Sequence, residues 1–177
     1  MIRKCFTIGW AISAAACLLW LAGTAWAAKP LLTYPVSGNV GSGMVEKAPD
    51  FTLKDLQGRK FSLNENKGKP VLLVFSTTWC PYCIEEIPRL KDIYAKYGTK
   101  GLLMLQVDIQ ESQAKVAKFV EKHKLPYRVL LDETADVAKS FGVQGVPTLV
   151  LLDKDGMIVC RQCPTIEPLL DKMFKQK

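Results

Sequence analysis

The motif Trp79-Cys80-Pro81-Tyr82-Cys83 constrains this chain more than any other feature, because of the segments on either side of it. The run 71–75 before it is wholly apolar, which is typical of a strand buried on both faces. The segment 81–97 after it predicts a helix, and proline at the first helical position costs no hydrogen bond. The sequence therefore predicts a buried strand that leads into a CxxC pair at the start of a helix.

The position of Cys80 and Cys83 at the start of the predicted helix predicts their chemistry. Cys80 would lie at the helix N-terminus, where unpaired N–H groups and the positive end of the helix dipole stabilise a thiolate. We expect Cys80 to be the attacking, solvent-facing thiol. Cys83, one turn further on, is placed to attack a mixed disulfide on Cys80 and release the product. The alternatives for this pair are an inert structural disulfide and half of a zinc site.

The rest of the domain predicts strands that alternate with helices. A hairpin is expected at 51–53 and 60–63, and a second hairpin at 148–152 and 157–159, joined by a turn at Lys154-Asp155-Gly156. Between them we predict strands at 102–107 and 127–131, and helices at 113–123 and 135–141. A last helix is expected at 166–174. This order indicates a three-layer α/β domain with a mixed central sheet.

The N-terminal region predicts export. Arg3 and Lys4 precede the uncharged stretch 5–28, and Ala25-Trp26-Ala27 is a pattern that signal peptidase cleaves. We interpret residues 1–27 as a signal peptide or an uncleaved membrane anchor, since 5–28 is long enough to span a bilayer. Residues 28–47 are rich in Gly, Ser and Pro and are expected to be a flexible tether. Residues 48–177 form the folded domain, in an extracytoplasmic or periplasmic location.

Composition excludes several classes of function. The chain has 24 Lys and Arg against 17 Asp and Glu, a formal net charge of +7. The lysines are spread over several segments and often stand beside acidic residues, which favours solvated helix faces over a nucleic-acid partner. The sequence contains no flavin, nicotinamide or haem motif, so no cofactor is expected.

Four features stand together in the domain. They are Ala48-Pro49-Asp50-Phe51, the CxxC motif extended by Glu86-Ile87-Pro88, Gly145-Val146-Pro147-Thr148, and the additional helix and strand within 113–131. With them the chain resembles the thioredoxin superfamily, and more narrowly its exported TlpA-like and cytochrome c maturation reductases. The resemblance implies a thioredoxin-like fold with an N-terminal β-hairpin and an inserted helix–strand unit.

The resemblance also implies roles for individual residues. Pro147 would be the cis-proline of the family, and the backbone of Val146 would pair with a substrate chain. Apart from the resemblance, Trp79, Pro81 and Tyr82 lie next to Cys80 in the sequence, and we expect them to line the substrate groove. Glu86 resembles the acidic residue through which such reductases exchange a proton with the second cysteine, and its alternative is an exposed helix residue.

The same resemblance implies partners. Protein thiols and disulfides would be the substrates, for example the haem-attachment thiols of apocytochrome c, and a membrane thiol carrier would supply electrons. The chain departs from plain thioredoxins at Val74, where they carry a buried acid, so Glu86 would have to substitute. The Pro-Tyr dipeptide between the cysteines resembles that of glutaredoxins. The close alternative to a reductase is a thiol oxidase or isomerase.

A second pair, Cys160 and Cys163, follows the last predicted strand. Because that strand returns toward the end of the sheet where Pro147 lies, the two CxxC pairs are expected to be close. Three interpretations compete for the second pair: a structural disulfide, a redox relay and a metal site. A further class of function is copper or zinc handling by both pairs, although no metal site is assigned.

Overall fold

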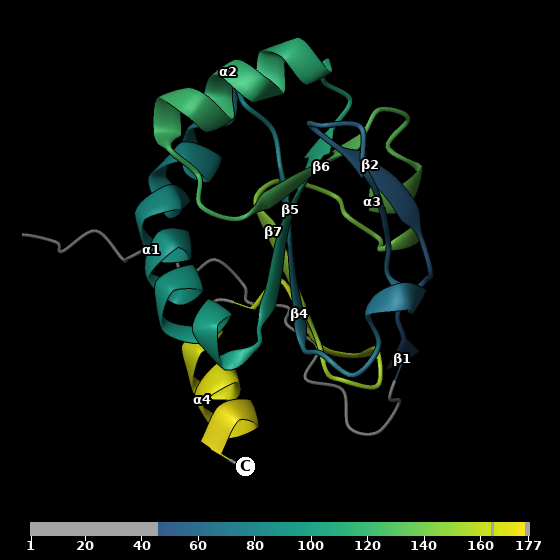
Figure 1. The fold of residues 1–177 in the computed structure, drawn as a ribbon, viewed down its shortest axis with the longest axis vertical. Helices are drawn as coiled ribbons and strands as arrows, with labels where there is room; N and C mark the ends of the chain where they lie inside the picture. Colours follow the sequence, from purple (N-terminus) through teal and green to yellow (C-terminus); the bar gives the residue numbers. More distant parts are fainter. Residues whose placement is uncertain (1–45, 164, 176–177) are drawn as a thin grey trace, which may run out of the picture. The chain divides into compact units, whose positions relative to one another are not determined.

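The computed structural model describes residues 46–163 and 165–175, and within them one eight-stranded mixed sheet carries helices on both faces (Figure 1). The strands are β1 (Glu46–Lys47), β2 (Thr52–Asp55), β3 (Lys60–Ser62), β4 (Val71–Ser76), β5 (Leu103–Ile109), β6 (Arg128–Asp132), β7 (Thr148–Leu152) and β8 (Met157–Arg161). The helices are α1 (Pro81–Tyr97), α2 (Gln113–His123), α3 (Asp136–Ser140) and α4 (Glu167–Lys175), with short 3-10 turns at Asn64–Asn66 and Gly98–Lys100.

The strands lie side by side in the order β1-β8-β7-β4-β5-β6-β2-β3. The neighbours β4, β5 and β6 run parallel, whereas β7 runs antiparallel to β4 and β8 antiparallel to β7. All six residues of β4 and all five of β7 are buried. These strands are covered on both faces, which explains why their sequences are continuous apolar runs rather than alternating patterns.

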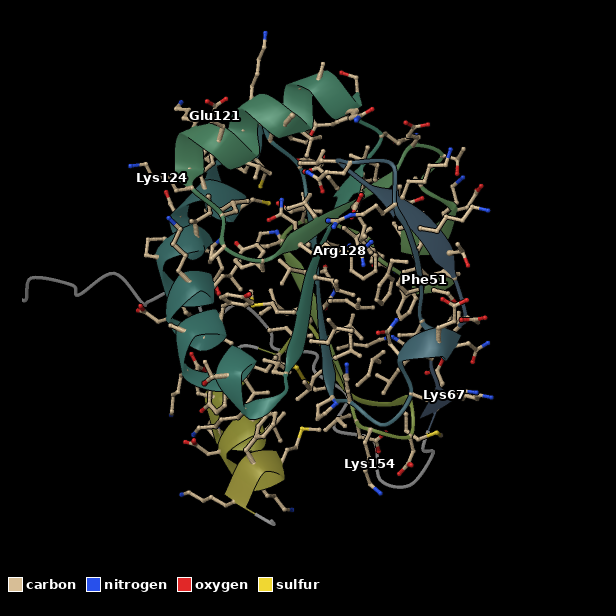
Figure 2. The ribbon with its side chains drawn as sticks, viewed as in Figure 1. Phe51, Lys67, Glu121, Lys124, Arg128 and Lys154 are labelled. Atoms are coloured by element: carbon tan, nitrogen blue, oxygen red, sulfur yellow. A yellow bond between two sulfur atoms is a disulfide. The ribbon has the colours of Figure 1, made fainter. Side chains whose placement is uncertain are left out.

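Two hydrophobic cores flank the sheet. Alternate residues of β4 point to opposite faces, so that Leu72 and Val74 enter one core and Leu73 and Phe75 enter the other. The first core is closed by α1, α2 and α4, and the second by α3 together with the β2–β3 hairpin. Figure 2 shows the side chains that fill both layers. The predicted three-layer thioredoxin-like fold is therefore confirmed.

The predicted elements agree with the observed ones to within two residues at each end. Helices α1 and α2 have the expected bounds, and both predicted hairpins form, as β2–β3 and β7–β8. The N-terminal boundary differs, because Glu46 and Lys47, assigned to the tether, pair with Ile158 and Met157 as strand β1. The rest of the expected tether and the expected leader lie outside the described residues.

The two ends of the sheet have different roles. Strand β4 ends at Ser76, just before the first CxxC pair, whereas β1 pairs with the start of β8, at the opposite end. Antiparallel pairing of β7 with β4 places Thr148 opposite Phe75, so that the residues preceding Thr148 reach the CxxC end.

Within the described ranges, no helix has both the length and the apolar character needed to cross a membrane.

Candidate active site

The first CxxC pair lies where β4 passes into α1. Cys80 is the N-cap residue of α1, in an extended conformation, and its Sγ accepts a hydrogen bond from the Cys83 N–H at 3.4 Å. The Cys80 thiol donates to the Val146 carbonyl oxygen at 3.5 Å. The peptide bond between Val146 and Pro147 is cis, as the family resemblance implied. Both cysteines are free thiols.

The two cysteines are buried, whereas the residues before and between them are exposed. Cys80 is only 4% exposed, so the expected solvent-facing thiol is instead covered, with the carbonyl of Val146 against its sulfur. Trp79 and Tyr82 are 66% and 70% exposed, and Pro81 is exposed as well. Two aromatic rings beside a recessed thiol form an apolar surface that another protein chain can contact.

The second cysteine is harder to ionise. Burial raises the pKa of the Cys83 thiol to about 11, and the neighbouring Cys80 acts in the same direction. Hydrogen bonds from the Ser76 hydroxyl and the Thr77 N–H lower that pKa and only partly offset the burial. Cys83 is therefore a neutral thiol at neutral pH, and it must lose a proton before it can act as a nucleophile.

Glu86 lies on α1, one turn beyond Cys83, and is engaged elsewhere. Its carboxylate forms an ion pair with Arg89, whose Nε and Nη2 also donate to Glu167 of α4 at 2.8 and 2.9 Å. Glu86 is therefore part of a salt bridge network between α1 and α4. The hydrogen bonds that set the pKa of Cys83 come from Ser76, Thr77 and Cys80.

Two acidic residues near the pair were missed by the sequence interpretation. Asp108 ends the buried part of β5 and is fully buried, and Glu111 follows in the loop before α2. The Glu111 carboxylate accepts from the Thr78 N–H at 2.5 Å and from the Thr78 hydroxyl at 2.7 Å. It thus fixes the loop that leads to Cys80. The available signal was an acid at the carboxyl end of a parallel strand beside β4, where sites gather in α/β sheets.

The second pair is a disulfide, Cys160 to Cys163, with its Cα atoms 5.9 Å apart. Cys163 is buried in the core beneath α1, and Cys160 is part-buried at the end of β8. The Gln162 N–H donates to the Leu149 carbonyl, which places the disulfide two strands away from β4. Among the described residues, no group of three or more His, Cys, Asp and Glu side chains is arranged to hold a metal ion.

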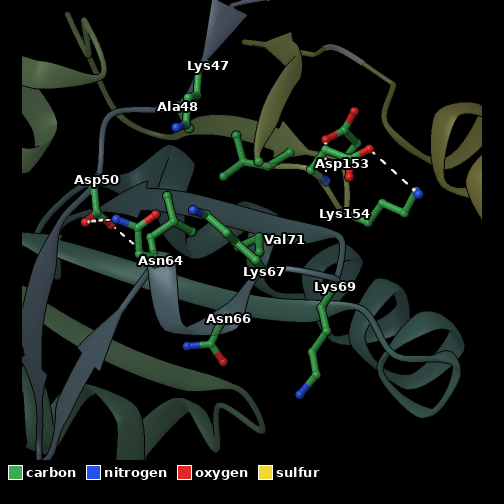
Figure 3. A pocket seen from close by; sticks show the side chains of 14 residues that line it. Lys47, Ala48, Asp50, Asn64, Asn66, Lys67, Lys69, Val71, Asp153 and Lys154 are labelled. Atoms are coloured by element: carbon green, nitrogen blue, oxygen red, sulfur yellow. Dashed lines mark hydrogen bonds and ion pairs between the residues drawn. The ribbon is translucent and has the colours of Figure 1, made fainter.

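A cavity of about 280 Å³ lies at the other end of the sheet (Figure 3). Lysine and aspartate side chains line it, with Lys47 and Asp50 on one side and Asp153 and Lys154 at the β7–β8 turn. The Asp50 carboxylate accepts from Asn64, which ties the start of the domain to the segment after β3. This cavity contains no cysteine and is separated from the CxxC pair by the length of β4.

The chain is similar to known proteins in sequence and in structure. Thiol-disulfide oxidoreductase ResA of Bacillus thuringiensis is 38% identical over 114 residues, which cover 64% of this chain and 66% of that protein, just under two thirds. The crystal structure of the thioredoxin domain of a Bacteroides vulgatus thiol-disulfide oxidoreductase matches 75% of this chain and 96% of its own, with a TM-score of 0.66 and 30% identity.

A third similar protein is a secreted Mycobacterium tuberculosis disulfide oxidoreductase, described as homologous to DsbE of E. coli. It matches 70% of this chain and 93% of its own, with a TM-score of 0.60 and 25% identity. The sequence model of the AhpC/TSA family matches residues 44–174, most of the chain and all of the described sheet. The chain therefore belongs to the AhpC/TSA family, with a thioredoxin-like fold.

Proposed function

We propose that this protein is an exported thiol:disulfide oxidoreductase that reduces disulfides of other exported proteins through Cys80 and Cys83. The observation that carries the proposal is the pair of free thiols at the start of α1, with the cis Val146–Pro147 bond against Cys80. Its relatives bear names of the same activity. The dithiol itself carries the two electrons that reduce one substrate disulfide.

The reaction divides between the two cysteines. The Cys80 thiolate attacks a substrate disulfide, forms a mixed disulfide with one substrate sulfur and releases the other as a thiolate. Cys83 then loses its proton and attacks the Cys80 sulfur, which forms the Cys80–Cys83 disulfide and releases the second substrate thiolate. The substrate gains two electrons and the enzyme loses them. The helix N-terminus supports the first step, where Cys80 carries the charge.

The surface around Cys80 is suited to an extended protein chain. Trp79, Pro81 and Tyr82, which are next to Cys80 in the chain, present exposed surface. The Val146 carbonyl, now occupied by the Cys80 thiol, becomes available once the sulfur turns toward a substrate, and Pro147 holds it in place. We assign substrate contact to these residues because they are exposed neighbours of Cys80 in the chain or belong to the Val146–Pro147 segment that contacts its sulfur.

The reducing direction is supported by Cys83. A strong oxidant of this type has a stabilised reduced form. Here burial raises the pKa of Cys83 to about 11, so Cys83 contributes no stabilised thiolate to the reduced form, unlike in a strong oxidant. Apocytochrome c thiols are the substrates we propose, with a membrane thiol carrier as electron donor. A reduction potential above that of protein disulfide isomerase, measured against glutathione buffers, would instead favour an oxidase or isomerase.

Export is proposed from residues 1–47. Arg3 and Lys4 before the uncharged stretch 5–28 are the features that support it, and residues 28–47 supply a tether. We expect a fusion of residues 1–47 to alkaline phosphatase, which is active only outside the cytoplasm, to be active in a bacterial host. Replacement of two leucines of the apolar stretch by aspartate is the matched control, which should abolish that activity.

The catalytic assignment is tested by two serine variants. Cys80→Ser should abolish reduction of insulin by dithiothreitol-recharged enzyme, since no sulfur remains to attack. Cys83→Ser should accumulate a mixed disulfide with the substrate, visible by mass spectrometry under non-reducing conditions. The double variant Cys160→Ser/Cys163→Ser is the control and should retain activity. Full insulin reduction by Cys80→Ser would show that the first pair is not the working dithiol.

A further inference from the structure

The end of the sheet opposite Cys80, which we call the base, carries more basic than acidic side chains around its cavities. Two cavities of about 280 and 420 Å³ open there, and the β7–β8 turn lines both of them. Five lysines and three aspartates line the two cavities: Lys47, Lys67, Lys69, Lys100 and Lys154, with Asp50, Asp153 and Asp155. All five lysines are exposed to solvent, so the base presents their positive charge outward.

The aspartates of the base are hydrogen-bonded within the protein. The Asp50 carboxylate accepts from the Asn64 N–H at 3.0 Å. Asp153 Oδ1 accepts from the N–H groups of Asp155 and Met157, each at 2.9 Å, and so closes the β7–β8 turn. These hydrogen bonds account for two of the acids, because each of them holds a loop of the base in place.

Most of the lysines of the base, by contrast, have no acidic partner. Lys154 Nζ lies 3.8 Å from Asp155. In the residues that the structure describes, no carboxylate lies within ion-pair distance of the other four lysines. Figure 3 shows the Lys67 side chain reaching toward Asn64 and the Lys69 side chain extending away from the cavity. The ammonium groups are therefore available to an anion from outside the chain.

Apolar side chains lie between these lysines. Leu63, Val71 and Leu152 are buried and form the floor of the first cavity. Met173 and Phe174 of α4 are part-buried and line the second cavity. Exposed lysines that flank partly exposed apolar side chains are suited to the headgroup region of an anionic bilayer, where phosphates lie beside the ends of the acyl chains.

The polypeptide enters the domain at the base. Glu46 is the first described residue, and the next residue, Lys47, lines the first cavity. Residues 29–45 can span at most about 60 Å even when fully extended. If the uncharged stretch 5–28 stays in the bilayer, the base is therefore held close to a membrane surface, at a high effective concentration. A soluble acidic protein would have no such covalent connection to the base.

We propose that the base docks on anionic phospholipids, with its lysine ammonium groups bound to the lipid phosphates and Met173 and Phe174 nearest the acyl chains. The proposal rests on the export proposed above, with residues 5–28 kept as an anchor. Because Cys80 lies at the other end of β4, docking would leave the reactive sulfur accessible to protein substrates.

Lysine reactivity in vesicles tests the proposal with the full chain. The protein is reconstituted into vesicles of phosphatidylcholine alone and into vesicles that also contain phosphatidylglycerol. A membrane-impermeant acetylating reagent then modifies the outward-facing domains, and mass spectrometry gives the acetylation rate of each lysine. Lys118 of α2 is the internal control, because it is exposed and forms no ion pair with the described residues.

We expect Lys47, Lys67 and Lys69 to react about threefold more slowly on the anionic vesicles, because lipid phosphates cover them. Lys118 should react equally on both. Raising the salt to about 0.5 M NaCl should remove the protection, since surface charges are screened at that ionic strength. Equal rates at Lys67 on the two kinds of vesicle would overturn the proposal. Equal protection of Lys118 would do the same, because it would indicate adsorption without a preferred face.

Two variants with the same loss of charge locate the docking surface. Lys67→Gln/Lys69→Gln should lose the protection of Lys47, whereas Lys118→Gln/Lys122→Gln, which alters α2, should retain it. Inorganic phosphate added to phosphatidylcholine vesicles should leave Lys47 reactive, and protection by it would show that the base binds free phosphate and not a membrane.

The same preparations separate this proposal from the proposed function. Both variants should reduce insulin normally, because the altered lysines lie away from Cys80. Normal insulin reduction without lipid protection in the wild type would refute docking alone. Protection without insulin reduction would refute the dithiol function and leave docking in place.

Discussion

Asp108 couples folding to pH at the scale of a single residue. The pKa of an exposed aspartate is about 3.8, whereas burial raises that of Asp108 to about 8. The folded state therefore holds this proton more tightly than the unfolded state does. Protonated Asp108 contributes stability in full below the ordinary pKa, and that contribution declines as the pH rises through the pKa of the folded state.

Asp108→Asn should remove this dependence, because asparagine mimics the protonated acid and does not titrate. Urea unfolding midpoints measured from pH 5 to pH 9 should fall less in the variant than in the wild type, with the variant the more stable at pH 8. Parallel curves for the two proteins would show that Asp108 has an ordinary pKa. The exposed Asp136→Asn variant, measured in the same way, serves as the control.

Asp108 also shows what local sequence patterns omit. The predicted strand ended at Val107, because counting apolar residues stops at the first charge. Only the register of β5 against β4 places Asp108 beside Ser76 and beneath α1. Cys80 and Cys83 were predictable because strand, turn and helix signals meet at one motif. Pro147 was predictable only from the family resemblance.

At the scale of elements, Asp55 fastens the β2–β3 hairpin to the central sheet. Its carboxylate accepts from the N–H groups of Gln57 and Arg59, from Arg59 Nε at 2.9 Å and from Arg128 Nε of β6 at 2.9 Å. Although burial opposes ionisation, these hydrogen bonds and the charge of Arg128 lower the pKa of Asp55. The Arg128 guanidinium in turn lies over the Phe61 ring (Figure 2 labels Arg128).

Asp55→Asn should cost about 1–3 kcal/mol of unfolding free energy at pH 7, since it weakens a buried carboxylate that satisfies several donors. The wild type should lose the same stability as the pH falls through the lowered pKa of Asp55, so the difference between the two proteins should shrink in acid. Chemical denaturation at pH 7 and pH 3 measures both values. A difference that grows in acid would contradict the assignment.

The shortest element was not predictable. Strand β1 has two exposed residues, Glu46 and Lys47, and neither shows an apolar period. Its pairing with β8 depends on where the chain returns after the β7–β8 turn. That position is set by the tertiary structure and not by the local sequence. Helix α1, by contrast, was predicted with its full bounds, because Pro81 marks its start and Gly98 follows its last residue.

At the scale of the whole molecule, the two cores share every central strand. Phe75 and Leu73 belong to one core and Val74 to the other, yet all three are neighbours on β4. If β4 detached, both hydrophobic cores would lose side chains, so we expect the domain to unfold as a single cooperative unit. The Cys160–Cys163 disulfide closes the chain between β8 and α4, on the layer beneath α1.

Removing that disulfide tests whether it is structural or a relay. It spans a sequence separation of 3, and closing so short a loop is worth about 2 kcal/mol in the chain-entropy model. Cys160→Ala/Cys163→Ala should lower the unfolding free energy by about that amount and keep one transition and normal insulin reduction. A folded variant with lost steady-state turnover but a normal first turnover would identify the pair as a relay.

The position of β1 determines how this protein can be linked to a solid surface or to another protein. The chain enters the domain against the start of β8, and the six residues of β4 separate that end of the sheet from Cys80 by about 20 Å. A support, a reporter protein or an electrode linked ahead of residue 46 would therefore be attached at the end of the sheet opposite Cys80. The reactive sulfur and its two exposed aromatic rings would face outward, free to meet a partner in solution.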